Sequence, residues 1–137
     1  MPTTRELSIR MEDRPGAFGK ICRVLADHDV NILAFQTFQL PDKKSLVRFV
    51  TDNPSVARKA FDSEGLSCTE TEVAQARLAN RPGALAQAAS KLGEANININ
   101  YSYCGVEGTK AIPVLVFGVE DVGKAAKILE QAAAVAA

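Results

Sequence analysis

The sequence predicts an α+β protein that contains two copies of one β-α-β-β-α-β unit. The main observation is a repeated turn, because residues 13–18 (DRPGAF) return 67 positions later as residues 80–85 (NRPGAL). The two halves also match further along, where residues 47–61 align with residues 115–129 at an offset of 68. Self-similarity at a fixed period is typical of repeated structural units. The repeat therefore predicts the architecture before any single residue is considered.

The first unit opens with a strand, a turn and a helix. Apolar residues alternate over residues 6–11, which predicts a strand with one buried face. The DRPG turn ends this strand, and Pro15 suits the first turn of a helix. An apolar stripe at positions i, i+3, i+4 and i+7 predicts an amphipathic helix, and it is made by Phe18, Ile21, Cys22 and Leu25. We expect Asp29 in this unit, and Asn96 in the second, to end the helix.

The remainder of the first unit is predicted to be a hairpin followed by a helix. A second strand starts directly after the first helix, and residues 41–44 form the hairpin turn. A third strand follows at residues 46–51 and a helix at residues 54–63, with Asp52 as a plausible cap. Residues 66–78 must then hold both the last strand of the first unit and the first strand of the second.

The second unit repeats this pattern but ends early. Residues 97–103 alternate between apolar and polar side chains, which predicts a strand with one wet face. A strand at residues 112–119 and a helix at residues 122–134 follow, with Asp121 as a cap. Little chain is left for a final strand. We therefore expect two ferredoxin-like units, each with its helices on one face of an antiparallel sheet, and the second without its last strand.

Length and composition favour two small domains, residues 1–71 and residues 72–137. A unit of this size is only marginally stable alone, because it buries only roughly 60% of the surface that its unfolded chain exposes. The chain has 16 basic and 16 acidic residues and no basic stripe, so we expect no nucleic-acid partner. No apolar run reaches the roughly 18 residues of a membrane span. The three cysteines are far apart, which indicates free thiols and a cytoplasmic protein.

The sequence offers little that could catalyse a reaction. His28 is the only histidine, at the predicted end of a helix, where we expect it to be exposed. The chain has no C-x-x-C, H-E-x-x-H or P-loop motif. It also has few residues that could ligate a metal. We expect no enzyme activity, no catalytic residues, no metal and no cofactor.

The repeated pattern resembles the ACT domain. The resemblance rests on a strand, a D/N-R-P-G-A turn, a helix and a V/I-N-I strand start, present twice. It covers nearly the whole chain, and a tandem pair without a catalytic domain is similar to the small ACT-repeat proteins of bacteria. ACT domains generally bind small regulatory ligands, most often amino acids, where two units lie side by side.

The resemblance implies ligand positions at the repeated turn and at the start of the second strand of each unit. In the first unit these positions are Asp13, Arg14, Gly16, Ala17, Phe18, Asn31 and Ile32. In the second unit they are Asn80, Gly83, Ala84, Leu85, Asn98 and Ile99.

The chemistry of these residues suits an amino acid. Glycine allows the backbone to approach a ligand closely, and the free N–H groups at a helix start can hold a carboxylate. Asp13 can accept a bond from an ammonium group and carries a charge that Asn80 lacks. We therefore expect the turn of the first unit to be the stronger site, facing the second unit. The amides of Asn31 and Asn98 can both donate and accept hydrogen bonds.

Structural explanations of the same residues remain open. Asp13 and Asn80 are alternatively helix N-caps. Asn31 and Asn98 alternatively satisfy the backbone of a turn. The arginine of each turn is alternatively a solvated side chain, and Tyr101 is expected in a core or an interface.

Two classes of function follow from the sequence. One is a regulatory protein that binds an amino-acid effector. The other is a regulatory subunit or dimerisation module for a separate enzyme of amino-acid biosynthesis, such as acetolactate synthase. Leu33 and Phe35 place apolar side chains where the second unit has Asn100 and Ser102, which favours a homodimer.

Overall fold

The structure is a computed structural model, which describes residues 3–136, with side chains described as far as Ala133. Its helices and strands follow the order predicted from the sequence. They are β1 (Thr3–Glu12), α1 (Ala17–Asp27), β2 (Ile32–Leu40), β3 (Lys44–Thr51), α2 (Pro54–Ser63), β4 (Thr69–Arg77), α3 (Ala84–Glu94), β5 (Tyr101–Glu107), β6 (Ile112–Gly118) and α4 (Val122–Ala136). No helix within residues 3–136 is long and apolar enough to cross a membrane.

The chain divides into two compact units. The N-terminal unit is Arg5–Thr71, and the C-terminal unit is Glu72–Ala137 together with Met1–Thr4. The division falls inside β4, which is one continuous strand. A single strand therefore ends the first unit and begins the second, with no linker between them.

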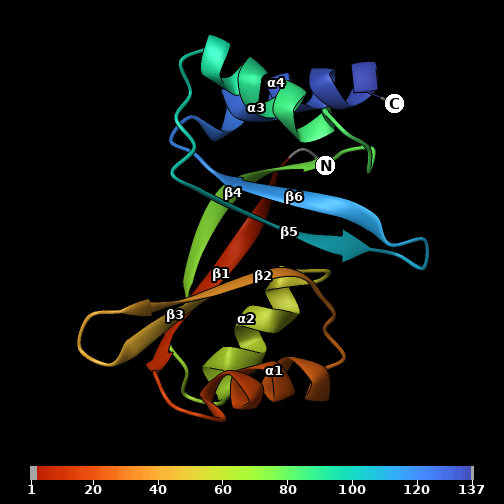
Figure 1. Cartoon of the computed structure of the whole chain (residues 1–137). Helices are drawn as coiled ribbons and strands as arrows, with labels where there is room; N and C mark the ends of the chain where they lie inside the picture. Colours follow the sequence, from red (N-terminus) through yellow and green to blue (C-terminus); the bar gives the residue numbers. More distant parts are fainter. Residues whose placement is uncertain (1–2, 137) are drawn as a thin grey trace. The chain divides into compact units, whose positions relative to one another are not determined.

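In the N-terminal unit, β3 lies between β1 and β2 and is antiparallel to both. Helices α1 and α2 cover one face of this sheet (Figure 1). The predicted stripe of α1 points into the core, where Ile21 and Leu25 are buried and Phe18 and Cys22 are partly buried. The buried core consists of Leu7, Ile9, Ile21, Leu25, Val30, Val47, Phe49, Ala57 and Phe61.

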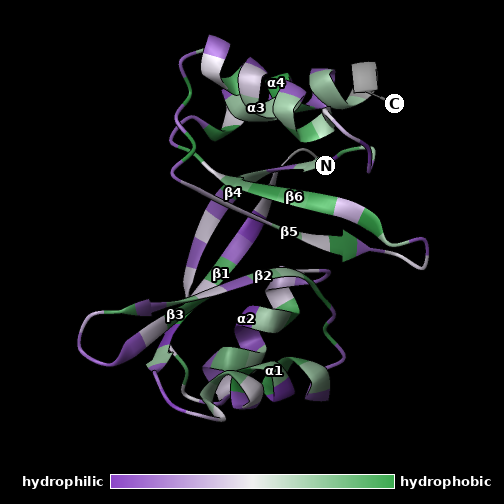
Figure 2. Ribbon diagram, in the orientation of Figure 1, coloured by the Kyte–Doolittle hydropathy of each residue, from purple (hydrophilic) through white to green (hydrophobic). Residues whose placement is uncertain are grey.

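In the C-terminal unit, β6 lies between β4 and β5 and is antiparallel to both. Helices α3 and α4 cover one face of this sheet (Figure 1). Figure 2 shows hydrophobic residues along β6, whose Val114, Val116 and Phe117 are buried. Ala88 of α3 is fully buried where α1 has Ile21, so smaller side chains form this helix–sheet contact.

The helices that follow the repeated turns end in the same way. Asp29 has φ 58° and Asn96 has φ 61°, both in the left-handed region. The N–H of the following residue donates a hydrogen bond to the carbonyl oxygen five residues earlier. These bonds run from Val30 to Leu25 at 3.0 Å and from Ile97 to Leu92 at 2.9 Å. This is the Schellman arrangement. The prediction that Asp29 and Asn96 end these helices is confirmed.

The strand predicted over residues 97–103 begins later than expected. β5 starts at Tyr101, and residues 97–100 are irregular. Ile97 and Ile99 still pack against the core. The alternation in the sequence therefore reflects the burial of every second side chain. Such burial does not require the segment to pair as a strand.

One predicted cap is wrong and one is confirmed. The N-cap of α2 is Asn53, whose Oδ1 accepts a bond from the Val56 N–H at 3.2 Å. Asp52 instead accepts a bond from the Asn31 N–H. Asp121 does cap α4, because its Oδ1 accepts a bond from the Lys124 N–H at 3.1 Å.

The first residues of β1 belong to the C-terminal unit. Gln75 of β4 is buried, and its Nε2 donates a bond of 3.4 Å to the carbonyl oxygen of Thr3. At the other end of this unit, the described chain has no strand after α4. The C-terminal unit therefore takes a contact from the start of the chain.

Candidate functional site

The two repeated turns have nearly the same backbone conformation. Gly16 has φ 89° and ψ −16°, and Gly83 has φ 88° and ψ −14°. A positive φ of this size favours glycine, which explains why both copies keep it. Each glycine is the N-cap of the following helix, and no side chain caps either helix. The alternative interpretation of Asp13 and Asn80 as N-caps is therefore wrong.

The carboxylate of Asp13 is held by the hairpin of β2 and β3. Gln39 Nε2 donates a bond of 2.7 Å to Asp13 Oδ2, and Ser45 Oγ donates a bond of 3.0 Å to Asp13 Oδ1. The Asp13 N–H donates a bond of 3.0 Å to the carbonyl oxygen of Lys43. The hairpin thus fixes the position of the charge. A carboxylate has about four lone-pair sites, so it can accept further bonds.

A cavity of about 320 Å³ lies beside this turn, and we call it the turn pocket. It brings together three of the sequence-predicted residues, Asp13, Arg14 and Phe18. The other residues of its lining come from the end of β1 and from the hairpin, and they are Met11, Glu12, Thr37, Phe38, Gln39 and Ser45. The turn pocket therefore combines two carboxylates, those of Glu12 and Asp13, with a guanidinium group and aromatic walls.

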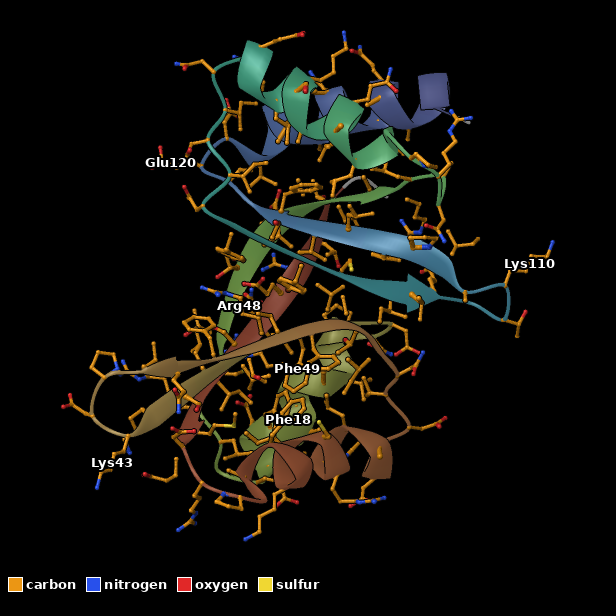
Figure 3. All side chains as sticks on the ribbon, viewed as in Figure 1. Phe18, Lys43, Arg48, Phe49, Lys110 and Glu120 are labelled. Atoms are coloured by element: carbon orange, nitrogen blue, oxygen red, sulfur yellow. The ribbon has the colours of Figure 1, made fainter. Side chains whose placement is uncertain are left out.

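Phe18 is fixed by neighbouring aromatic rings. Its ring centroid lies 5.4 Å from that of Phe35 and 6.2 Å from that of Phe49. Figure 3 shows Phe18 and Phe49 side by side above α1. Phe35, which the sequence placed on an open apolar face, is 50% exposed and covers Phe18. These contacts hold one wall of the turn pocket in place.

Asn31 and Ile32 lie at the far end of β2 from the turn pocket. The Asn31 N–H donates a bond of 3.0 Å to Asp52 Oδ1, and the Asp52 N–H donates one of 3.0 Å to the Asn31 carbonyl oxygen. Gln39, which holds Asp13, is seven strand residues beyond Ile32, or about 23 Å at the rise of a β-strand. Within the N-terminal unit, the structure does not bring Asn31 together with Asp13.

The C-terminal unit also separates its predicted residues. Asn98 lines a second cavity, of about 240 Å³, whose lining is Asn96, Ile97, Asn98, Asn100, Glu120 and Asp121. This cavity contains none of the predicted residues of the turn, which are Asn80, Gly83, Ala84 and Leu85. Asn98 Nδ2 donates a bond of 3.0 Å to Asn100 Oδ1, while Ile99 packs against the core. Leu85 is 53% exposed, in contrast to Phe18 at the equivalent position.

Sequence reasoning missed the part of the turn pocket that comes from the hairpin. Gln39 and Ser45 hold Asp13, and Arg48 lies over the Phe38 ring at 5.0 Å from its centroid. Strand alternation places Thr37 and Gln39 on one face of β2. Only the register of the hairpin shows that this face meets the turn.

None of the three cysteines lines the turn pocket, and neither does His28. Burial raises the pKa of the Cys22 thiol and of the Cys68 thiol, so both are held in the protonated form. His28 is exposed, as predicted, with Nδ1 2.9 Å from the carbonyl oxygen of Val24. Within the described residues, no group of three histidine, cysteine or acidic side chains could hold a metal ion.

Solved structures show the same fold along nearly the whole chain. Protein BT0572 from Bacteroides thetaiotaomicron has a TM-score of 0.81 and 23% identity, with 95% of this chain and 88% of that chain covered. The regulatory subunit of aspartate kinase from Thermus thermophilus has a TM-score of 0.61 and 15% identity, with 96% and 92% covered. The one from Thermus flavus has a TM-score of 0.54 and 16% identity, with 96% and 97% covered. Comparison with the curated proteins gave no match.

The family comparison agrees with the repeat seen in the sequence. A family model described as an ACT domain pair matches residues 2–135, which includes both repeated turns and all the strands. The chain therefore belongs to the ACT domain pair family.

Proposed function

We propose that this chain is a non-catalytic regulatory protein of the cytoplasm that binds an amino acid at its ACT units, residues 1–71 and 72–137. The observation that carries this proposal is the turn pocket, where Asp13 presents a fixed carboxylate beside the start of α1. Family membership supports a regulatory role, because the comparable domains occur in regulatory subunits.

The turn pocket offers a partner for each group of an amino acid. The carboxylate of Asp13 accepts bonds from the ammonium group. The Arg14 guanidinium group and the N–H of Phe18, both at the start of α1, suit a carboxylate. Phe18 and Phe38 supply apolar walls for a side chain. The turn of the C-terminal unit has the same backbone but lacks the charge of Asp13, so we expect weaker binding there.

The binding site is proposed to be completed by a second ACT unit. Asn31 lies at the opposite end of β2 from Asp13, so one ligand cannot touch both residues of the same unit. A ligand that contacts a turn and an asparagine must lie where the turn of one unit meets the strand start of another. Such a site requires paired units, as a homodimer of the chain would supply.

The second candidate role is that of a regulatory subunit for a separate enzyme. It is favoured by the coverage of the Thermus thermophilus structure, of which 92% aligns with this chain and which is itself described as a regulatory subunit. A partner enzyme in amino-acid biosynthesis would be the target of the effector. Co-purification of one such enzyme with the chain, lost on addition of the effector or strengthened by it, would support this role.

We also propose that each unit has the ferredoxin-like arrangement. The contact of Thr3 with Gln75 supports this for the C-terminal unit, because it places the start of β1 against β4. The start of the chain would then supply a strand to the C-terminal sheet. Deletion of residues 1–4 is expected to destabilise the C-terminal unit.

A thermal-shift screen of the twenty amino acids on the purified chain tests the proposed function. A ligand at about 100 times its dissociation constant stabilises the folded state by about 2.7 kcal/mol, which raises Tm by several degrees. One amino acid, or one chemically related group, is expected to give this shift. No shift with any amino acid at about 1 mM, the upper end of common physiological substrate levels, would contradict the proposal.

A further inference from the structure

A second and larger cavity lies in the N-terminal unit, and we call it the basic groove. Its volume is about 640 Å³, within the range of about 300–1,000 Å³ that is common for small-molecule sites. It lies between the end of β1, the start of α1 and the segment after α2. Its floor is apolar and is formed by Met11, Ala17, Ile21, Val24 and Leu66.

The rim of the basic groove is rich in positive charge. Four cationic side chains line it, namely Arg10, Arg14, Lys20 and Lys44, against the two carboxylates of Glu12 and Glu64. Lys44 forms an ion pair with Glu12. Apart from this pair, the rim has the three cations Arg10, Arg14 and Lys20 and the one carboxylate of Glu64. The rim therefore has an excess of two positive charges. An apolar floor below a cationic rim complements a molecule with an apolar body and a negative end.

The fold does not require all of these charges, because the second copy keeps only Arg77 and Arg81, at the positions of Arg10 and Arg14. At the equivalent positions of the second copy, Gln87 replaces Lys20, Ile112 replaces Lys44 and Ala132 replaces Glu64. The floor differs as well, because Lys91 stands where the first copy has Val24. Both copies form the same helix and strands, so the combination of apolar floor and cationic rim is specific to the N-terminal unit.

We propose that the basic groove binds an organic carboxylate with an aliphatic body, of the size of a medium-chain fatty acid. The aliphatic body lies on the floor between Ile21 and Leu66, and the carboxylate meets Lys20 and Arg10 at the rim. This site goes beyond the amino-acid site, since its lining shares only Met11, Glu12 and Arg14 with that of the turn pocket. Arg14 lines both cavities, so the two ligands would influence each other's binding.

Isothermal titration calorimetry of the full chain with sodium octanoate tests the proposal, in the absence of amino acids. Lys20→Glu reverses one charge at the rim. Lys59→Glu makes the same change on α2, at an exposed lysine that does not line the groove. Reversal of a charge about 5 Å from the ligand in water-like surroundings is expected to weaken binding by about tenfold. Lys59→Glu is expected to leave the affinity unchanged within about twofold.

A second variant and a second ligand test the apolar and the charged parts separately. Val24→Gln places a neutral polar group in the floor, at the position where the second copy has Lys91, so octanoate binding is expected to be weakened. Octan-1-ol has the same body without the charge, so it is expected to bind more weakly than octanoate. Circular dichroism and Tm confirm that each variant is folded before its affinity is compared.

Three results would overturn the proposal. The first is no octanoate binding by the wild-type chain at millimolar concentration. The second is equal loss in Lys20→Glu and Lys59→Glu, which would indicate attraction by overall charge only. The third is a dimer that dissociates in Lys20→Glu, which would show that a second copy of the chain occupies the groove. None of these results bears on the amino-acid screen, so the two proposals fail separately.

Discussion

Asp13 and Gln39 are joined by a hydrogen bond of 2.7 Å from Gln39 Nε2 to Asp13 Oδ2. The bond connects the repeated turn with the last residues of β2, which are far from the turn in sequence. It aims a carboxylate into the turn pocket and leaves some of its lone pairs available. Asn31 lies at the other end of β2, so one unit does not bring Asn31 and Asp13 together.

Asp13→Asn is expected to weaken binding of the effector amino acid. The substitution copies the residue of the second unit and removes the negative charge that faces the ammonium group. Loss of a charge-assisted hydrogen bond of roughly 1.5 kcal/mol corresponds to about a tenfold rise in Kd. Calorimetric titration of the wild-type and variant chains with the amino acid found in the screen measures this change.

Asn80→Asp is the matched control for that experiment. It places the charge of the first unit on the second turn, whose backbone has the same conformation. Binding at the second turn is expected to become tighter. Loss of binding in Asn80→Ala with no loss in Asp13→Asn would reverse our assignment of the stronger site.

Gly16→Ala is expected to destabilise the N-terminal unit by about 1 kcal/mol or slightly more, because a left-handed conformation is costly for any residue with a Cβ. A Cβ at this position would meet no atom within 4 Å, so the cost is one of backbone conformation only. Gly19→Ala lies in the same helix, also with open space, and is expected to stabilise by up to about 1 kcal/mol. Urea unfolding measures both. Effects of the same sign in the two variants would contradict the turn geometry.

The ion pair of Arg77 and Glu107 is expected to make stability depend on pH in the acid range. Its two atoms Arg77 Nη2 and Glu107 Oε2 are 2.9 Å apart. The hydrogen bond from Arg77, and then its charge, lower the pKa of Glu107 below its ordinary value of about 4.3. A lowered pKa in the folded state stabilises the protein above the ordinary value, and this stabilisation is lost as the pH falls through the folded-state pKa.

Glu107→Gln tests this pH dependence. Glu107 is more than a third exposed, so the loss at pH 7 is expected to be less than about 1 kcal/mol. The fall in the free energy of unfolding between about pH 5 and pH 3 is expected to become shallower. Arg77→Gln removes the charge that lowers the pKa of Glu107. It is expected to flatten the same part of the curve of unfolding free energy against pH. If the free energy of unfolding of both variants fell with pH as steeply as that of the wild type, the pair would not act as described.

The sequence predicted most of the fold because the repeated signals are local. The glycine of each turn, the stripe of α1 and the left-handed Asp29 and Asn96 all depend on neighbouring residues. The prediction for α2, over residues 54–63, matches the structure at both ends. The start of β5 was wrong by four residues, because Ile97 and Ile99 are buried without belonging to a strand.

The candidate site was less predictable because it depends on the register of distant segments. The turn residues were visible in sequence as a repeated motif. The contacts of Asp13 with Gln39 and Ser45 follow from the hairpin register, which local patterns do not fix. The separation of Asn31 from Asp13 also follows only from the direction of β2 relative to the turn.

The most direct test of the central claim is an amide nuclear magnetic resonance titration of the chain with the amino acid found by thermal shift. The account predicts that the largest changes are at the amides of Asp13, Arg14 and Phe18, which line the turn pocket. Asp13→Asn should shift these changes to higher ligand concentration. An amino acid that stabilises the chain without changing these amides would contradict binding at the repeated turn.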